Sequence, residues 1–172
     1  MLTLLLFRHA KSDWSADLAD HERPLNKRGV KAAPLVARHI ASSGQTPDRI
    51  LCSDAARTRA TLSLALTELP NPAPAVDIDE RLYLAAAETI LDVIRERAGK
   101  TDNRLMVIGH NPGLHALALT LIGNGDKKSI GTMATKFPTA ALAIITFDTD
   151  TWTGIGPASG TLVAFLVPRD LD

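Results

Sequence analysis

The sequence predicts an α/β fold, a three-layer αβα sandwich whose sheet is mostly parallel with a mixed edge. Between residues 2 and 122, apolar segments that fit buried strands alternate with helical segments, as in folds whose parallel strands are joined by crossover helices. Two β-rich segments, 140–147 and 161–167, then flank a stretch rich in turn residues, which predicts a terminal hairpin. The hairpin accounts for the mixed edge of the predicted sheet.

Length and composition favour one domain, residues 1–172, and a cytoplasmic protein. The 172 residues are enough for one well-packed core and too few for two. Lys plus Arg equals Asp plus Glu at 19 each, so no broad basic surface for nucleic acid or membrane is predicted. The single cysteine, Cys52, excludes an internal disulfide and a multi-cysteine zinc site, which fits a reducing compartment.

The first strand is predicted at Leu2 to Phe7, a run of apolar or β-compatible residues that is too short to span a bilayer. The run ends in Arg8-His9, so a cation and an imidazole follow a buried strand. In open α/β sheets, ligands bind at the carboxyl ends of the strands, so this position indicates chemistry. The polar segment 15–23 is expected to form a loop over these strand ends.

The other elements are predicted from hydrophobic periodicity and turn residues. Strands are expected at residues 49–52, 76–78 and 104–108, and helices at residues 27–43, 55–68, 86–98 and 113–122. Pro34 should kink or shorten the first of these helices. Residues 123–126 are expected to form a turn, and residues 127–138 an irregular loop.

Short polar residues mark three predicted helix starts. Asn26 is expected to cap the helix that follows it, because an asparagine side chain can accept a hydrogen bond from a free N–H of the first turn. Ser53 and Asp54 are expected to do the same for the next helix. Asn111 as N-cap and Pro112 as first helical residue predict the start of the helix that ends near residue 122.

Three strand-to-helix junctions carry the residues expected to perform chemistry, namely Arg8-His9, Arg57 and His110. Parallel strands bring these junctions to one edge of the sheet, so two arginines and two histidines are expected to share a pocket. Guanidinium groups bind phosphoryl oxygens in pairs, which predicts a phosphate site. Nearby cations keep an imidazole neutral, so His9 or His110 could attack phosphorus while the other hydrogen-bonds the phosphoryl oxygens.

Four motifs, in their order and spacing, resemble the histidine phosphatase superfamily, whose fold is phosphoglycerate mutase-like. They are Arg8-His9-Ala10, Pro24-Leu25-Asn26-x-x-Gly29, Ser53-x-x-x-Arg57-x-x-x-Thr61 and Gly109-His110-Asn111-Pro112. They extend over most of the chain, which makes the match specific. The short length and the segments Lys11 to Trp14 and Pro138 to Ala140 resemble the small SixA-type phosphohistidine phosphatases.

The resemblance implies a metal-independent phosphohydrolase that needs no cofactor. It implies that His9 is the nucleophile, which forms a phosphohistidine intermediate, and that Arg8, Arg57 and His110 form the phosphate pocket. A zinc site built from His9, His110 and a carboxylate is the alternative, but the arginines would repel a metal dication. We therefore expect no metal.

Two features depart from the family pattern. Ala10 stands where the superfamily usually has glycine, and we expect activity to survive this small change. The usual general acid is a carboxylate, and the segment that resembles its position in mutase-like members makes Glu80 the candidate. Asp13 and Asp20, in the first loop, are other carboxylates that could reach the site. A phosphoramidate leaving group depends less on such an acid than a phosphomonoester does.

The expected substrate is a phosphorylated protein, most specifically protein phosphohistidine. Between Thr61 and Leu105 there is room for one loop and one helix, so no capping insertion closes over a small ligand. A phosphatase of small phosphorylated metabolites and a non-catalytic phosphate-binding adaptor are the alternatives. Thr139 is expected to face the pocket. The remaining histidines, His21, His39 and His115, are expected to be solvated or packing residues.

Overall fold

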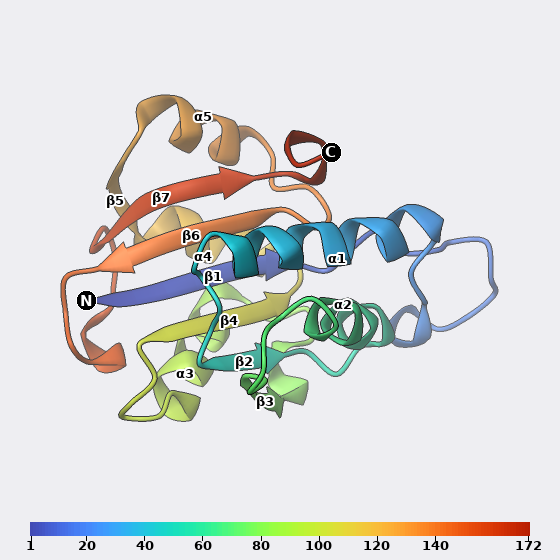
Figure 1. Ribbon diagram of the computed structural model, residues 1–172, viewed down its shortest axis with the longest axis horizontal. Helices are drawn as coiled ribbons and strands as arrows, with labels where there is room; N and C mark the ends of the chain where they lie inside the picture. Colours follow the sequence, from blue (N-terminus) through green and yellow to red (C-terminus); the bar gives the residue numbers. More distant parts are fainter.

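A computed structural model describes residues 1–172 and contains a seven-stranded sheet with helices on both faces (Figure 1). The strands are β1 (Leu2–Arg8), β2 (Arg49–Cys52), β3 (Ala75–Ile78), β4 (Arg104–Gly109), β5 (Ile122–Gly125), β6 (Leu142–Phe147) and β7 (Gly160–Leu166). The α-helices are α1 (Lys27–Ser42), α2 (Ala56–Leu66), α3 (Ala87–Arg97), α4 (Gly113–Leu121) and α5 (Lys127–Thr135). No helix combines the length and the apolar composition needed to cross a bilayer.

The strand order is β3-β2-β4-β1-β6-β7-β5, and β6 is the antiparallel strand. β1 pairs in parallel with β4, β4 with β2, and β2 with β3. β6 and β7 form the predicted hairpin, and β5 is parallel to β7. The predicted αβα fold with a mostly parallel sheet and a mixed edge is therefore confirmed.

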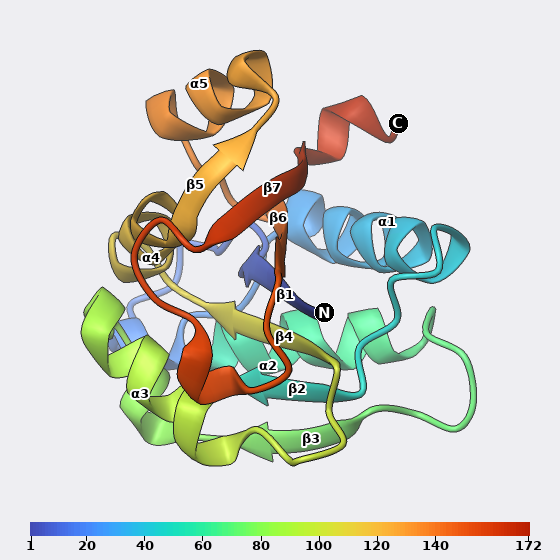
Figure 2. The same ribbon diagram turned by 90° about the vertical axis from the view of Figure 1, so that its left-hand side faces the viewer.

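Side chains of the sheet alternate between two separate cores. In β1, Leu4 and Leu6 pack toward α3, α4 and α5, whereas Leu5 and Phe7 pack toward α1 and α2. Figure 2 shows the sheet between these two helical layers. Both faces of β1 are covered, which is why its sequence is apolar throughout instead of alternating with polar residues. The central strand thus enters the site from a rigid, fully buried position.

The region after α4 differs from the prediction. Residues 122–125 form β5, where a turn was predicted, and residues 127–135 form α5, where an irregular loop was predicted. Asp126 caps α5, because its Oδ2 accepts the Ser129 N–H at 2.9 Å. Met133, fully buried, fixes the helix against the core. The Asp-x-x-Ser spacing was the sequence signal for this helix, and Gly131 within it weakened the helical pattern.

The helix starts are partly as predicted. Asn26 caps α1, since its Oδ1 accepts the Gly29 N–H at 2.9 Å, and α1 continues to Ser42, so Pro34 does not shorten it. At α4 the prediction was wrong by one residue, because Pro112 is the N-cap and the helix begins at Gly113. Asn111 instead donates its side-chain amide to the Phe137 carbonyl at 2.8 Å.

The predicted cap of α2 was also wrong. The helix begins at Ala56 with Ala55 as N-cap, and no side chain caps it. Ser53 Oγ accepts the Ala55 N–H at 3.3 Å. It also contacts His110, so this side chain faces that histidine from the end of β2 and does not cap the helix. The Thr58 hydroxyl donates to the Ser53 and Ala55 carbonyls and fixes the turn between β2 and α2.

Candidate active site

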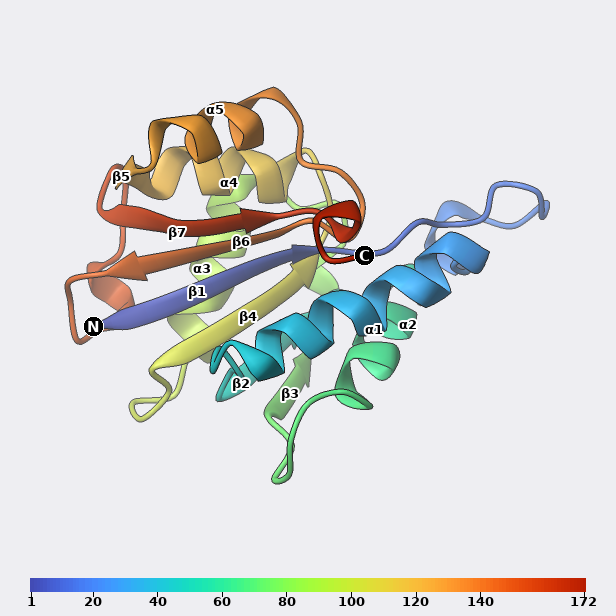
Figure 3. The same cartoon turned by 45° about the horizontal axis from the view of Figure 1, so that its top comes forward.

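The predicted phosphate-binding residues meet at the carboxyl ends of the central strands. Arg8 ends β1, His9 follows it, His110 follows β4, and Arg57 lies in the first turn of α2 after β2. Figure 3 shows the tips of β1 and β4 side by side, with the chain after β1 extending beyond them before it returns into α1. A cavity of about 370 Å³ lies here, lined by Arg8, His9, Lys11, Ser12, Trp14, Asp20, Arg23, Arg57, Leu84, His110, Asn111 and Thr139.

His9 is a neutral imidazole with one free nitrogen. Its Nδ1 lies 2.8 Å from the Ala10 carbonyl oxygen, which can only accept, so Nδ1 carries the ring proton and Nε2 keeps its lone pair. The side chain is 6% exposed, and this burial, with the nearby Arg57 and Arg8 charges, lowers the pKa of His9 to about 4. At neutral pH, Nε2 is therefore available as a nucleophile.

His110 faces His9, with ring centroids 5.2 Å apart. Burial and then the His9 and Arg57 charges lower the pKa of His110 to about 3, so it too is neutral. Its Nε2 lies 2.8 Å from Ser53 Oγ, which already accepts the Ala55 N–H and so has its own hydrogen available for this bond. When the Ser53 hydroxyl donates to Nε2, the proton of the neutral ring is on Nδ1, which is buried and has no partner in the protein.

The two arginines contribute further donors without partners. Arg57 is 3% exposed and donates to the Asp20 backbone and side chain, and Arg8 donates to the Phe137 carbonyl at 3.1 Å. The Nε atoms of Arg8 and Arg57 are buried without a hydrogen-bond partner, as is Nδ1 of His110. A buried donor without an acceptor costs roughly 1–3 kcal/mol. An oxyanion in the cavity is the kind of ligand that supplies acceptors to such donors.

Asp20 lines the same cavity and is ionised. Its carboxylate accepts the Tyr83 hydroxyl, the Arg57 guanidinium at 3.1 Å and the Arg23 Nε at 3.1 Å. These contacts, the Tyr83 hydrogen bond first, lower the pKa of Asp20 to about 2. Tyr83 also stacks edge-on against His110, with ring centroids 5.4 Å apart. Asp20 and Tyr83 therefore connect the first loop to Arg57 on one side of the pocket and to His110 on the other.

Two of the sequence motifs hold the His9 segment in place. Thr61 Oγ1 accepts the Ala10 N–H at 3.0 Å, which explains the threonine four residues after Arg57. The Asn26 N–H donates to the Lys11 carbonyl at 2.9 Å, and a Cβ on Gly29 would lie 2.3 Å from that carbonyl oxygen. The start of α1 thus approaches the backbone after His9 so closely that only glycine fits at residue 29.

Comparison with known proteins agrees with this geometry. The model of the histidine phosphatase superfamily (branch 1) matches residues 4–83, which contain Arg8, His9 and Arg57. The chain is also 38% identical over 164 residues to the uncharacterized protein Rv1276c of Mycobacterium tuberculosis, covering 94% of this chain and 99% of that protein. The chain belongs to the histidine phosphatase superfamily.

Solved structures place it with the SixA-type members of the superfamily. A candidate phosphohistidine phosphatase SixA from Agrobacterium tumefaciens is 28% identical, with a TM-score of 0.80 over 97% of this chain and 98% of that one. The protein histidine phosphatase SixA in complex with tungstate has the same fold, with a TM-score of 0.79, 20% identity and coverage of 99% and 100%. As a member of this superfamily, the protein is a phosphatase, and its substrate is phosphorylated.

The candidate general acids of this histidine phosphatase are placed differently from the sequence prediction. Glu80 is exposed on a 3-10 helix (Glu80–Leu82) and does not line the pocket. The physical reason is the preceding residue, since the buried Asp79 carboxylate binds Arg81 and Arg97 and so anchors this helix away from the pocket. Tyr83, three residues after Glu80, contacts the site instead.

Of the two loop carboxylates, Asp20 lies in the pocket and Asp13 does not. Asp13 accepts the Ser15 N–H at 2.7 Å and is exposed, although its neighbour Trp14 reaches the pocket. Thr139 lines the pocket as predicted. Arg23 and Leu84 also line it, and sequence reasoning missed both. The signals available were the arginine just before the Pro24 motif and the apolar residue just after Tyr83.

His21 and His115 lie outside the pocket, and no zinc site is formed there. His115 donates to the Met133 carbonyl, with 2.7 Å between the two heavy atoms, and His21 lies between Glu22 and Asp54, so both act outside the pocket. The structure groups no three His, Cys, Asp or Glu side chains closely enough to hold a metal ion. The zinc site considered from the sequence therefore has no set of protein ligands.

Proposed function

We propose that this protein is a phosphohistidine phosphatase that removes the phosphoryl group from a histidine of a protein through a phosphohistidine intermediate on His9. The observation that carries the proposal is the hydrogen bond between His9 Nδ1 and the Ala10 carbonyl. The Nδ1 proton is held by this carbonyl, and the Nε2 lone pair faces a pocket whose other donors are Arg8, Arg57 and His110. This is a nucleophile beside donors suited to phosphoryl oxygens.

In the first step, His9 Nε2 attacks phosphorus and the bond from phosphorus to the substrate nitrogen breaks. When the other ring nitrogen of the substrate histidine is protonated, the leaving nitrogen takes the bonding pair and departs as a neutral imidazole. The Ala10 carbonyl stabilises the positive charge that forms on the His9 ring through the Nδ1–H bond. Arg8, Arg57 and His110 donate to the equatorial oxygens as the phosphoryl group is transferred.

In the second step, water attacks phosphorus, and the bond from phosphorus to Nε2 breaks. Nε2 recovers its lone pair, so His9 returns to its neutral state with the proton still on Nδ1. Both protons of the water leave with the phosphate as dihydrogen phosphate. The reaction therefore balances without a carboxylic acid in either step, which matters because the pocket's carboxylate, Asp20, is ionised.

The state of Asp20 favours phosphohistidine over an alkyl phosphomonoester. An alkoxide leaving group needs a proton, and a carboxylate that accepts hydrogen bonds from Tyr83, Arg57 and Arg23 has none to give. The name of the similar Agrobacterium structure, a candidate phosphohistidine phosphatase, points the same way. For a protein as the carrier of the phosphoryl group, the support is the pocket mouth, where Trp14 is 73% and Leu84 52% exposed.

Rapid-quench labelling tests the proposal. A protein phosphorylated with ³²P on histidine is mixed with enzyme in the presence of EDTA and quenched in alkali, where phosphohistidine survives. Label is expected on His9 of the wild type, with steady turnover, and neither label nor turnover is expected for His9→Asn. His39→Asn, at a histidine of α1 outside the pocket, is the matched control and should retain activity.

The same assay, repeated without EDTA and with phosphorylated metabolites as substrates, separates the alternatives. Binding of the phosphoprotein without label or turnover would favour the adaptor, and loss of activity with EDTA would favour a metal enzyme. Preferential turnover of phosphorylated metabolites would favour the small-molecule phosphatase. Full turnover by His9→Asn would contradict the mechanism itself.

A further inference from the structure

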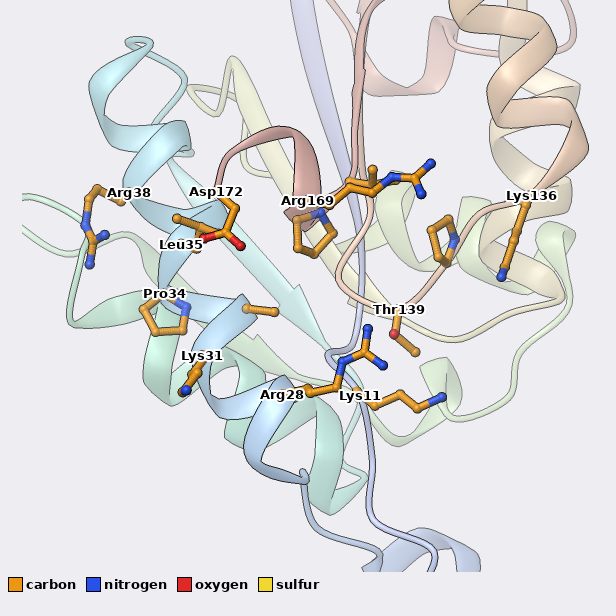
Figure 4. A pocket seen from close by; sticks show the side chains of 14 residues that line it. Lys11, Arg28, Lys31, Pro34, Leu35, Arg38, Lys136, Thr139, Arg169 and Asp172 are labelled. Atoms are coloured by element: carbon orange, nitrogen blue, oxygen red, sulfur yellow. The ribbon is translucent and has the colours of Figure 1, made fainter.

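A second cavity lies beside the catalytic pocket and is larger, with a volume of about 610 Å³. It is bounded by α1, by the segment between α5 and β6, and by the chain after β7. Lys11 and Thr139 line both cavities, so the two adjoin at these residues. Figure 4 shows Lys11, Arg28 and Thr139 together at the end nearest the pocket, and Arg38 at the far end of α1.

This cavity concentrates positive charge in a protein whose net charge is +0. Its cationic side chains, which together we call the basic cleft, are Lys11, Arg28, Lys31, Arg38, Lys136 and Arg169. One acidic residue, Asp172, lies among them. Arg38 pairs with Glu68, and the other five cations have no ion pair in the structure. These five charges are therefore available to an external anion.

The character of the lining favours a polypeptide over a small ligand. Sites for small molecules are usually enclosed, mostly apolar and equipped with a few polar groups. Here the six cations are all exposed, and the apolar side chains between them are small or few, chiefly Ala32, Leu35 and Val167. Exposed lysines and arginines spread along one helix face fit a broad acidic surface, which they would attract over a distance.

We propose that the basic cleft docks an acidic polypeptide surface that flanks the phosphohistidine of the substrate. The inference rests on the proposed function and extends it to the partner. A phosphohistidine whose phosphoryl group lies against Arg8 and Arg57 places its flanking residues near Lys11 and Thr139, where the cleft begins. Acidic side chains in those flanks pair with Arg28 and Lys31 of α1 and with Arg169.

Two synthetic phosphohistidine peptides test this, one with glutamates and one with glutamines on both sides of the phosphohistidine. At low salt the acidic peptide is expected to have a kcat/KM about tenfold higher or more, through KM and not kcat, since steering by charge changes association. In the variant Arg28→Ala/Lys31→Ala/Arg169→Ala this advantage is lost, while the glutamine peptide and phosphoramidate are hydrolysed as by the wild type. The advantage of the wild type also shrinks in high salt.

The matched control is Lys100→Ala/Lys127→Ala/Lys128→Ala, which removes the same charge from exposed lysines outside both cavities. It is expected to keep the preference for the acidic peptide. Equal rates for the two peptides with wild-type enzyme, or an equal loss in both triple variants, would overturn the inference. A third result would also overturn it: no preference between the two peptides, combined with tight binding of inorganic tripolyphosphate that abolishes catalysis only when the cleft is intact.

Failure of the proposed function gives a different result. In that case the wild type hydrolyses neither peptide nor phosphoramidate. The cleft is then tested by the affinity of the unphosphorylated acidic peptide, measured by fluorescence anisotropy. Binding that the Arg28, Lys31 and Arg169 substitutions weaken and the control leaves unchanged would support the cleft, and equal affinity for all three proteins would contradict it.

Discussion

The backbone N–H of Ala10 donates to the hydroxyl of Thr61 at 3.0 Å, and this bond joins the residue after His9 to the helix that carries Arg57. The same hydroxyl donates to the Arg57 carbonyl at 2.7 Å. One buried side chain therefore fixes the position of His9, which follows β1, relative to Arg57, which follows β2.

Thr61→Val should damage both stability and catalysis. Valine keeps the shape of threonine but leaves the buried Ala10 N–H without an acceptor, which costs about 1–3 kcal/mol of the free energy of unfolding. Urea unfolding measures this cost, and kcat should fall because His9 loses its support. Thr120→Val, where an exposed hydroxyl donates to the Ala116 carbonyl, is the control and should change neither quantity noticeably. An unchanged kcat in Thr61→Val would show that His9 is positioned by other contacts.

The two pocket histidines should titrate far below the ordinary histidine pKa. NMR of the imidazole carbons is expected to give pKa values of about 4 for His9 and about 3 for His110. His21, whose pKa is raised by the hydrogen bonds that it donates to Glu22 and Asp54, is an internal control that titrates on the opposite side of the ordinary value. Midpoints of His9 and His110 near that ordinary value would contradict the buried, neutral state.

The same shifts set the pH dependence of activity and of stability. Attack requires neutral His9, so kcat/KM should hold as pH falls below the ordinary histidine range and decline only as it approaches about 4. For stability, the unfolded chain takes up protons at about pH 6.5, whereas folded His9 and His110 do not until much lower pH. The contribution of these histidines to the free energy of unfolding therefore falls as pH decreases from about 6.5 toward 4.

Gly29→Ala should destabilise the protein because the added Cβ would lie 2.3 Å from the Lys11 carbonyl oxygen. This neighbour is backbone and cannot rotate away, so we expect a loss of about 1–3 kcal/mol in the free energy of unfolding, as for overpacked cores. Gly131→Ala is the matched control, since the corresponding Cβ meets nothing within 4 Å. That substitution should stabilise α5 by up to about 1 kcal/mol. Equal effects of the two substitutions in urea unfolding would contradict the close approach.

Asp20→Asn should strengthen the binding of oxyanions. The wild-type carboxylate pairs with Arg57 and competes with a phosphoryl group for the same guanidinium, so removal of its charge should lower the Kd of orthovanadate severalfold. Isothermal titration calorimetry measures the change, with Asp13→Asn in the same loop as control. Turnover of phosphohistidine is expected to persist. A loss of turnover confined to alkyl phosphomonoesters would instead identify Asp20 as a proton donor.

The sheet and the meeting of Arg8, His9, Arg57 and His110 in one pocket could be predicted from the sequence because they depend on local patterns. Buried strands such as β1 and β4 are apolar throughout, and parallel strands must end at one edge. β5 could not be predicted in this way, since its short, glycine-containing segment is a strand only because it pairs with β7, more than thirty residues later.

The position of Glu80 depended in part on a contact that is distant in sequence, the ion pair of Asp79 with Arg97. Asp79 binds Arg81 and Arg97, and this set of ion pairs decides which residues of the following turn face the pocket. The sequence correctly predicted that the segment around residue 80 reaches the pocket, but it indicated Glu80 as the residue that does so. In the structure Tyr83, and not Glu80, contacts Asp20 and His110. No pattern of neighbouring residues in the sequence predicts that Tyr83 faces the pocket and Glu80 does not.

The position of β4 between β1 and β2 has a consequence for the newly synthesised chain. Arg8, His9 and Arg57 have all left the ribosome long before residues 104–109, yet the strands that carry them pair with β4 and not with each other. Arg8 then requires the Phe137 carbonyl, which is translated later still. The pocket therefore assembles late in translation, and the nascent amino-terminal half lacks the strand and the carbonyl that complete it.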